Sequence, residues 1–268
     1  MITFALITGL GLLGPTALSN LPVSQAPQAT ASQDPAKDRY DRLVAEANDA
    51  TAAWGKRVAA LRAAELKGGD PVPAEAWESP MEAFIPRFVA AASDYAGKDA
   101  AIPYLKWVAK TGMPMLGAGR KAAKEALHEL VTTHRASDTL DELAWMLGRM
   151  VYFFGEAEGR AIATALQQDS PNAKVRTWAV FSLNSGALER DPVDSPSYAK
   201  AIGALRDALA SVELPMLAEE VENRIAVRAK FSLGMVAPDI AGVDLQDESF
   251  SLSDYRGKVV LVDFWGDW

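Results

Sequence analysis

The sequence contains no cysteine. A chain without thiols forms no disulfide, offers no thiolate nucleophile and binds no metal through sulfur. Histidine is scarce too, because His128 and His134 are the only two in 268 residues. Six residues apart, they would lie on opposite sides of a helix rather than at the i, i+4 offset of a metal-binding pair. We therefore expect no metal site and no cofactor.

Positive charge is also limited. The chain has 27 Lys and Arg residues against 35 Asp and Glu residues, which gives a net charge of -8. This balance argues against a broad basic face, so nucleic acid is not an expected partner. Because 49% of the 268 residues are apolar, the chain can bury one or two cores, and its length favours two domains.

Residues 1–20 form an apolar run that is interrupted at Pro15 and preceded by no basic residue. The uninterrupted part before Pro15 is shorter than the roughly 20 residues of a membrane span, and it predicts a signal peptide for export to the periplasm or another extracytoplasmic compartment. The alternative is an uncleaved N-terminal anchor, which would be the chain's only contact with a membrane. Residues 21–35 are rich in Gln, Ala, Ser and Pro and predict a flexible linker.

Residues 36–230 show apolar side chains at helical spacing, broken at short intervals by Gly, Asp and Ser-Pro. The pattern predicts a mainly α fold in which antiparallel helical hairpins form either a solenoid-like array or an irregular bundle. Ser79, Ser170 and Ser195 each precede a proline and are predicted N-caps. A single helix is expected from Asp138 to Val151.

Several aromatic residues lie among these apolar stripes, and we expect them in the core rather than in a ligand cage. They are Trp107, Trp145, Tyr152, Phe153, Phe154 and Trp178. No group of residues in the helical domain has the composition of an active site. Its expected role is structural or the binding of a protein partner.

After residue 230 the apolar spacing changes to short runs typical of strands. A hairpin is expected between Val243 and Leu252, with a polar turn at residues 246–249. The continuous apolar run from Val259 to Phe264 predicts a strand that is buried on both faces.

The order Gly-x-x-Ala-Pro238-Asp, hairpin, Ser-Leu-Ser-Asp-Tyr-Arg-Gly257-Lys258, then Val-Val-Leu-Val-Asp263-Phe-Trp-Gly-Asp-Trp resembles the start of a known domain. That domain is the thioredoxin fold of TlpA-like thiol-disulfide oxidoreductases, in the AhpC/TSA–redoxin superfamily. The resemblance covers roughly the last 35 of 268 residues. It implies that a Cys-x-x-Cys motif follows Trp268, so that residues 231–268 would be a truncated thioredoxin-like domain.

The resemblance also implies roles for single residues. Pro238 would shape the entry to the first strand, and Gly257 with Lys258 would form the turn before the central strand. Asp263 would be the buried acid that relays a proton to the redox pair; the alternative is a strand-end residue exposed to water. The aromatic residues that would flank the active-site loop are Phe264, Trp265 and Trp268. The hairpin turn departs from the family because it lacks Asp-Gly.

The first functional hypothesis is therefore an exported thiol-disulfide oxidoreductase, with protein thiols or disulfides as substrates and a reductant protein as partner. The chain as given would be inactive, because it contains no cysteine. Two alternatives remain open at this point. One is a helical scaffold for protein binding with a degenerate redox domain, and the other is a peroxiredoxin-like antioxidant protein.

Overall fold

The computed structural model describes residues 34–263, and this part is mainly helical, as the sequence predicts. Its α-helices are α1 (Pro35–Glu65), α2 (Met81–Ser93), α3 (Ile102–Gly112), α4 (Gly117–Thr132), α5 (Ala144–Leu147), α6 (Met150–Phe154), α7 (Glu156–Asp169), α8 (Ala173–Arg190), α9 (Pro196–Ala210) and α10 (Pro215–Phe231). Short 3₁₀ segments are η1 (Ala74–Trp77), η2 (Asp99–Ala101), η3 (Asp138–Leu143) and η4 (Leu252–Tyr255). The predicted signal or anchor (1–20) and all but the last two residues of the predicted linker (21–35) lie outside the described residues.

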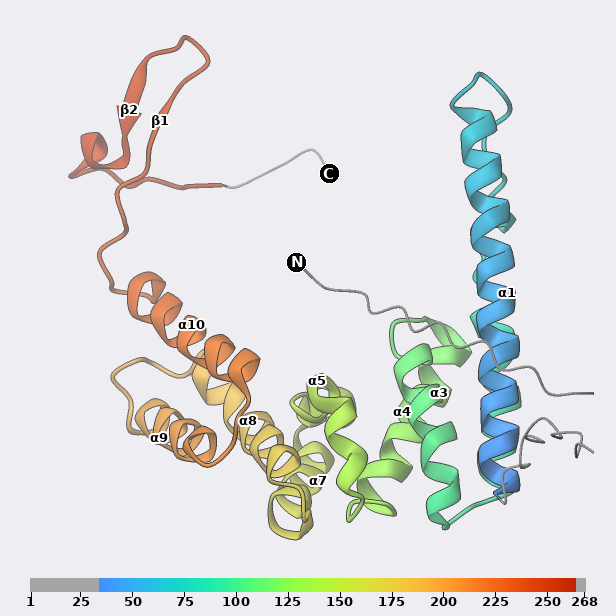
Figure 1. Cartoon of the computed structure of the whole chain (residues 1–268). Coiled ribbons are helices and arrows are strands. Elements are labelled where there is room, and N and C mark those ends of the chain that lie inside the picture. Colours follow the sequence, from blue (N-terminus) through green and yellow to red (C-terminus); the bar gives the residue numbers. More distant parts are fainter. Residues whose placement is uncertain (1–33, 264–268) are drawn as a thin grey trace, which may run out of the picture.

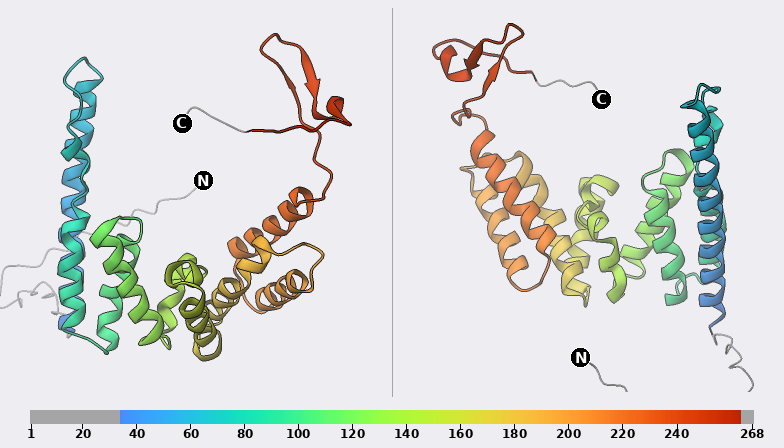
Figure 2. Two further views of the ribbon diagram at one scale, coloured as in Figure 1. Left: turned by 180° about the vertical axis from the view of Figure 1, so that it is seen from behind. Right: turned by 45° about the horizontal axis from the view of Figure 1, so that its top comes forward.

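The helices follow one another along an arc that runs from α1 to α10, with the β-strands beyond α10 (Figures 1 and 2). Most helices contact chiefly the helices next to them in the sequence, as in α2 with α3, α3 with α4, and α7 with α8, whereas α5 packs mainly on α8. Such nearest-neighbour packing resembles that of a solenoid. The mainly α fold is confirmed, and the choice between the two predicted architectures stays a prediction.

The first helix begins with a side-chain cap. The Asp34 carboxylate accepts hydrogen bonds from the backbone N–H groups of Ala36, at 3.0 Å, and Lys37, at 3.2 Å. Pro35 is the first helical residue, where its missing N–H leaves no hydrogen bond unmade. Near the other end of α1, the Trp54 indole N–H donates to the Ala76 carbonyl at 2.8 Å, which fixes η1 against the helix.

Two apolar clusters form the interior. The first extends from α1 to the start of α8 and includes Phe88, whose ring stacks on Trp107 with 3.6 Å between centroids. The second joins the end of α8 to α9 and α10, around Leu205 and Val221. Trp178 packs against both clusters, so α8 connects the two halves of the arc.

Of the three predicted N-caps, Ser195 is confirmed, whereas Ser79 and Ser170 are wrong. Ser195 caps α9 as expected, because its hydroxyl accepts from the Tyr198 N–H at 3.2 Å. Ser170 does not cap α8, since it is buried and Asn172 accepts from the Lys174 N–H at 2.9 Å instead. Ser79 is not the N-cap of α2 either: Pro80 occupies that position, and the Ser79 hydroxyl reaches only the Met81 N–H.

The single helix expected from Asp138 to Val151 is wrong. The chain forms η3, α5 and α6 there, with a break at Gly148. A Cβ at Gly148 would lie 2.8 Å from the Trp178 ring and 3.0 Å from the Phe181 ring. The break therefore brings the backbone close against the aromatic face of α8.

Most of the aromatic residues predicted to be in the core do pack there, but Trp145 and Tyr152 are exposed. Trp145 lies on α5, before the break at Gly148, and Tyr152 lies on α6, after it. Among residues 34–263, no helix combines the length and the apolar character that crossing a bilayer requires.

Candidate functional site

The resemblance assigns function to the segment that follows α10. Here β1 (Ala241–Val243) and β2 (Ser249–Ser251) pair as an antiparallel hairpin, with Gly242 opposite Phe250. A Cβ on Gly242 would still lie 3.5 Å from the Phe250 ring, so this ring covers the strand face.

The hairpin turn is built by Asp244. Its carboxylate accepts from the backbone N–H groups of Gln246, at 2.8 Å, and Glu248, at 3.0 Å. Asp247 takes a left-handed conformation with φ of 62°, which an Asp side chain tolerates better than most. These two aspartates supply the turn that the family's Asp-Gly would otherwise supply.

A second carboxylate ties the start of the hairpin to the segment after it. Asp239 accepts from the Ser253 backbone N–H at 2.8 Å and from its hydroxyl at 2.7 Å. These bonds from Ser253, first the hydroxyl and then the N–H, hold the pKa of the Asp239 carboxyl below its ordinary value. Ser251 and Asp254 form a capping box at the start of η4.

The predicted turn residues lie as a turn requires. Gly257 has a φ of 83°, a region where a Cβ is strained, and the Lys258 N–H donates to the Tyr255 carbonyl at 3.0 Å. The Lys258 ammonium lies 5.5 Å from the centre of the Tyr255 ring. Pro238 is exposed and lies three positions before the first residue of β1.

The strand predicted from Val259 to Phe264 is wrong for its described residues. Residues 259–263 belong to no strand, and Asp263 is exposed. Val259 and Leu261 are 104% and 94% exposed, whereas Val260 and Val262 are 43% and 44% exposed. The physical reason is that a central strand is buried only by strands and helices on both sides, and the described chain places none there. Phe264, Trp265 and Trp268 lie outside the described residues.

Asp263 is therefore not brought into an apolar environment with any other reactive group. The described segment supplies hairpin, turn and an unpaired apolar run, but no thiol, because the chain has no cysteine. Disulfide exchange proceeds through attack by a thiolate, which no residue of the given sequence supplies.

The two histidines are not part of one site. His128 Nε2 lies 3.1 Å from Glu158 on α7, and its ring meets Phe154 edge-on. His134 is buried after α4, with Nδ1 3.9 Å from Asp99. Within residues 34–263 no group of three or more His, Asp or Glu side chains is placed to hold a metal ion.

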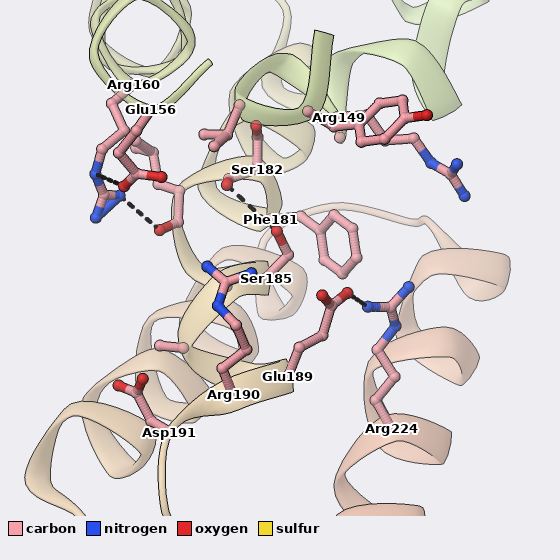
Figure 3. Close-up of a pocket in the computed structure, with 16 residues that line it drawn as sticks. Arg149, Glu156, Arg160, Phe181, Ser182, Ser185, Glu189, Arg190, Asp191 and Arg224 are labelled. Carbon is pink, nitrogen blue, oxygen red and sulfur yellow. Dashed lines mark hydrogen bonds and ion pairs between the residues drawn. The ribbon is translucent and has the colours of Figure 1, made fainter. Parts of the chain in front are cut away.

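The structure contains a cleft that sequence reasoning missed. It is about 550 Å³ in volume and lies between α6, α7, α8 and α10 (Figure 3). Four arginines line it, namely Arg149, Arg160, Arg190 and Arg224. They are widely separated in the sequence, so no local motif signals the cleft.

No family model and no solved structure matches the chain. Two curated proteins match a short stretch of it. The thiol-disulfide oxidoreductase ResA of Geobacillus kaustophilus is 41% identical over 46 residues, which are 17% of this chain and 26% of that protein. ResA of Geobacillus thermodenitrificans is 39% identical over 46 residues, with the same coverage. The chain thus spans about a quarter of the length of the curated relatives it matches. This local similarity supports a thioredoxin-like redox relationship for part of the chain.

Proposed function

We propose that the chain is the N-terminal part of an exported thiol-disulfide oxidoreductase, in which residues 231–268 begin a thioredoxin-like domain and residues 36–230 form a helical domain before it. The observation that carries this proposal is the similarity to two proteins named thiol-disulfide oxidoreductases. We assign that 46-residue similarity to the C-terminal part of the chain, because the ordered motifs from Pro238 to Asp263 lie there.

The exposed run at residues 259–262 supports the same proposal. Four consecutive apolar residues, with two of them almost fully exposed, are unfavourable in water and typical of a strand that lacks its neighbours. In a completed sheet the run would become a central strand, and Asp263 would lie at its buried end.

The chemistry would then be thiolate attack on a substrate disulfide. The first cysteine of a Cys-x-x-Cys pair forms a mixed disulfide with the substrate, and one substrate thiolate leaves. The second cysteine breaks the mixed disulfide, which releases the reduced substrate and leaves the pair oxidised. Asp263 would accept the proton of the second cysteine as a positioned general base. A reductant protein would restore the dithiol.

The first experiment is to sequence the coding region beyond the codon for Trp268. We expect a Cys-x-x-Cys motif directly after it. A continuation without cysteine would overturn the proposal.

The second experiment compares two purified proteins, the 268-residue chain and the protein extended through the redox pair. We expect the extended protein alone to reduce insulin disulfides with dithiothreitol as electron source. In the extended protein, Asp263→Asn should slow turnover by about 10²-fold and change its pH profile, because a positioned proton acceptor contributes a factor of this order. Glu248→Gln, an exposed change in the same segment, is the matched control. Equal rates for both variants would contradict the role of Asp263.

The export part of the proposal rests on residues 1–20 alone. We expect the mature protein, isolated from cells, to begin after this run, as measured by mass spectrometry of its N-terminal peptide. An intact N-terminus on a membrane-bound protein would instead support the anchor.

A second candidate function is a scaffold that binds a protein partner through the helical arc. The nearest-neighbour packing of α1 to α10 favours it, because solenoids present extended concave surfaces for binding. Residues 34–230 alone would then self-associate or capture a partner of the redox domain in cross-linking experiments. A monomer that captures nothing would leave the scaffold without support.

A further inference from the structure

The arginine cleft, defined as the cleft lined by Arg149, Arg160, Arg190 and Arg224, lies where the two apolar clusters meet. Its volume of about 550 Å³ falls within the range of small-molecule sites, which is about 300–1,000 Å³. One wall carries Phe181 of the second cluster, and the rim carries the exposed ring of Tyr152. Figure 3 shows these walls converging from four helices.

Two of the four arginines already have carboxylate partners. Arg160 Nε lies 3.2 Å from Glu156, and Arg160 also donates to the Leu183 carbonyl at 3.0 Å. Arg224 pairs with Glu189 and, at 2.6 Å, with Glu220. Both carboxylates that face these arginines in the cleft are therefore neutralised.

The other two arginines have no carboxylate partner among the described residues. Arg149 meets only the Trp145 ring, at 6.0 Å from its centre, and Arg190 forms no ion pair. Figure 3 shows the Arg190 guanidinium extending past Ser185 into the cleft, whereas Asp191 points elsewhere. A chain with a net charge of -8 thus keeps the exposed guanidinium groups of Arg149 and Arg190 at this cleft without a carboxylate partner among the described residues.

The backbone of α8 makes room for this guanidinium. A Cβ on Gly186 would lie 2.6 Å from Arg190 Nη2 and 3.4 Å from its Cζ. The Arg190 side chain therefore lies over Gly186, which has no side chain to obstruct it. Gly186 is helical with an ordinary φ, so the backbone conformation does not require a glycine at this position.

We propose that the arginine cleft binds a small organic anion, with Arg190 as the residue that receives its carboxylate or phosphate group. A guanidinium presents parallel N–H donors that match two oxygens of either group. Phe181 and Tyr152 would contact the apolar part of the ligand. The ligand is small because the cleft is about 550 Å³ in volume, and Asp191, which also lines it, would repel an extended polyanion such as nucleic acid.

The test is calorimetric titration of the whole 268-residue chain with benzoate and, separately, with inorganic phosphate, at constant ionic strength to hold charge screening fixed. We expect one saturable site for at least one probe. Saturation by benzoate alone identifies a carboxylate ligand with an apolar part, and saturation by phosphate alone identifies a phosphate ligand. No saturable binding of either probe up to about 10 mM, a range that includes weak complexes, would overturn the proposal.

Two variants and one control locate the site. Arg190→Gln should weaken binding at least tenfold, whereas Arg57→Gln, the same charge change on exposed α1, should not. Gly186→Ala keeps every charge but displaces the guanidinium, and it should also weaken binding while circular dichroism and the unfolding midpoint show an intact fold. Equal losses in Arg190→Gln and Arg57→Gln, or unchanged binding in Gly186→Ala, would overturn the assigned geometry.

Discussion

At the scale of single residues, Tyr104 joins two parts of the helical domain that are distant in the sequence. Its ring is fully buried and meets Tyr40 of α1 edge-on, with 5.4 Å between centroids. Its hydroxyl donates to the Ala36 carbonyl at 2.5 Å. One side chain thus holds the first turn of α1 against α3.

Replacing Tyr104 by Phe should remove this hydrogen bond and keep the ring packing. We expect the free energy of unfolding to fall by about 1 kcal/mol, the usual net contribution of one such bond. Urea unfolding followed by circular dichroism measures it. Tyr152→Phe is the control, because Tyr152 is exposed and should change stability by less than about 0.5 kcal/mol. An equal effect of both changes would contradict a structural role for the Tyr104 hydroxyl.

Asp239 predicts a local dependence on pH. Because its carboxyl pKa is lowered by the bonds from Ser253, the contact is present at neutral pH and is lost as pH falls through that lowered pKa. The Ser253 amide proton, followed by NMR, should therefore titrate with a midpoint below 3.8, the ordinary value for this carboxyl. In Asp239→Asn the same amide should show no such titration. A midpoint at or above the ordinary value would count against the bonded geometry.

At the scale of secondary-structure elements, α3 and α4 approach closely because the Cβ position of Gly112 faces the backbone of Gly119. A Cβ on Gly112 would lie 2.5 Å from the Gly119 carbonyl oxygen. Backbone atoms cannot move aside as the end of a side chain can, so the helices must separate if Gly112 is substituted.

Gly112→Ala should therefore destabilise the protein by about 1–3 kcal/mol, the usual cost of overpacking. The cost of overpacking should exceed the gain in helix propensity that comes from replacing glycine by alanine. Gly203→Ala in α9 is the matched control, since nothing lies within 4 Å of the place that its new methyl group would take, and it should stabilise by up to about 1 kcal/mol. Thermal or urea unfolding measures the change in stability of both variants. A Gly112→Ala protein as stable as the parent would show that the helices are not in this contact.

Two predicted helix starts and one predicted strand show which elements the sequence could predict. Ser195-Pro196 identifies the start of α9 because the cap and the proline act within one turn. The equivalent signal at Ser170-Pro171 fails because tertiary packing buries Ser170 and leaves Asn172 to cap. The strand at residues 259–263 fails for a different reason, since apolar spacing describes a strand only when other strands pair with it.

At the scale of the whole molecule, the helical fold follows from periodicity, but the arginine cleft does not. Arg149 lies between α5 and α6, whereas Arg160, Arg190 and Arg224 come from α7, α8 and α10, and only the fold brings the four together. The resemblance could assign roles to Pro238, Gly257 and Asp263 because they lie in one short segment, where a motif can be recognised from the sequence. Their chemistry stays a prediction, because Asp263 is exposed in the described chain.

The few contacts between the C-terminal segment and the helices predict that the two are energetically separate. A chain ending at Ser232 should keep the unfolding midpoint of the whole chain, because the principal contacts of β1 and β2 are with each other and with η4. It should also bind less of an apolar dye, since the exposed apolar residues at 259–262 are gone.

The matched control is a chain ending at Ser211. This shorter chain loses α10, and with it Leu217 and Val221, which are buried in the second cluster. Each lost buried side chain of this size costs about 2–5 kcal/mol, so its second cluster should unfold at lower urea. If both truncations behaved alike, the C-terminal segment and the helices would be one cooperative unit.

The nearest-neighbour arrangement of the arc also has a mechanical consequence. A row of units in which most contacts join neighbours bends like an elastic beam, because small rotations at successive interfaces accumulate along its length. The separation between α1 and the β1–β2 hairpin should accordingly vary over a wider range than the separation between α7 and α8. The range of positions that the hairpin takes relative to α1 should therefore depend on the stiffness of the helix–helix interfaces between them.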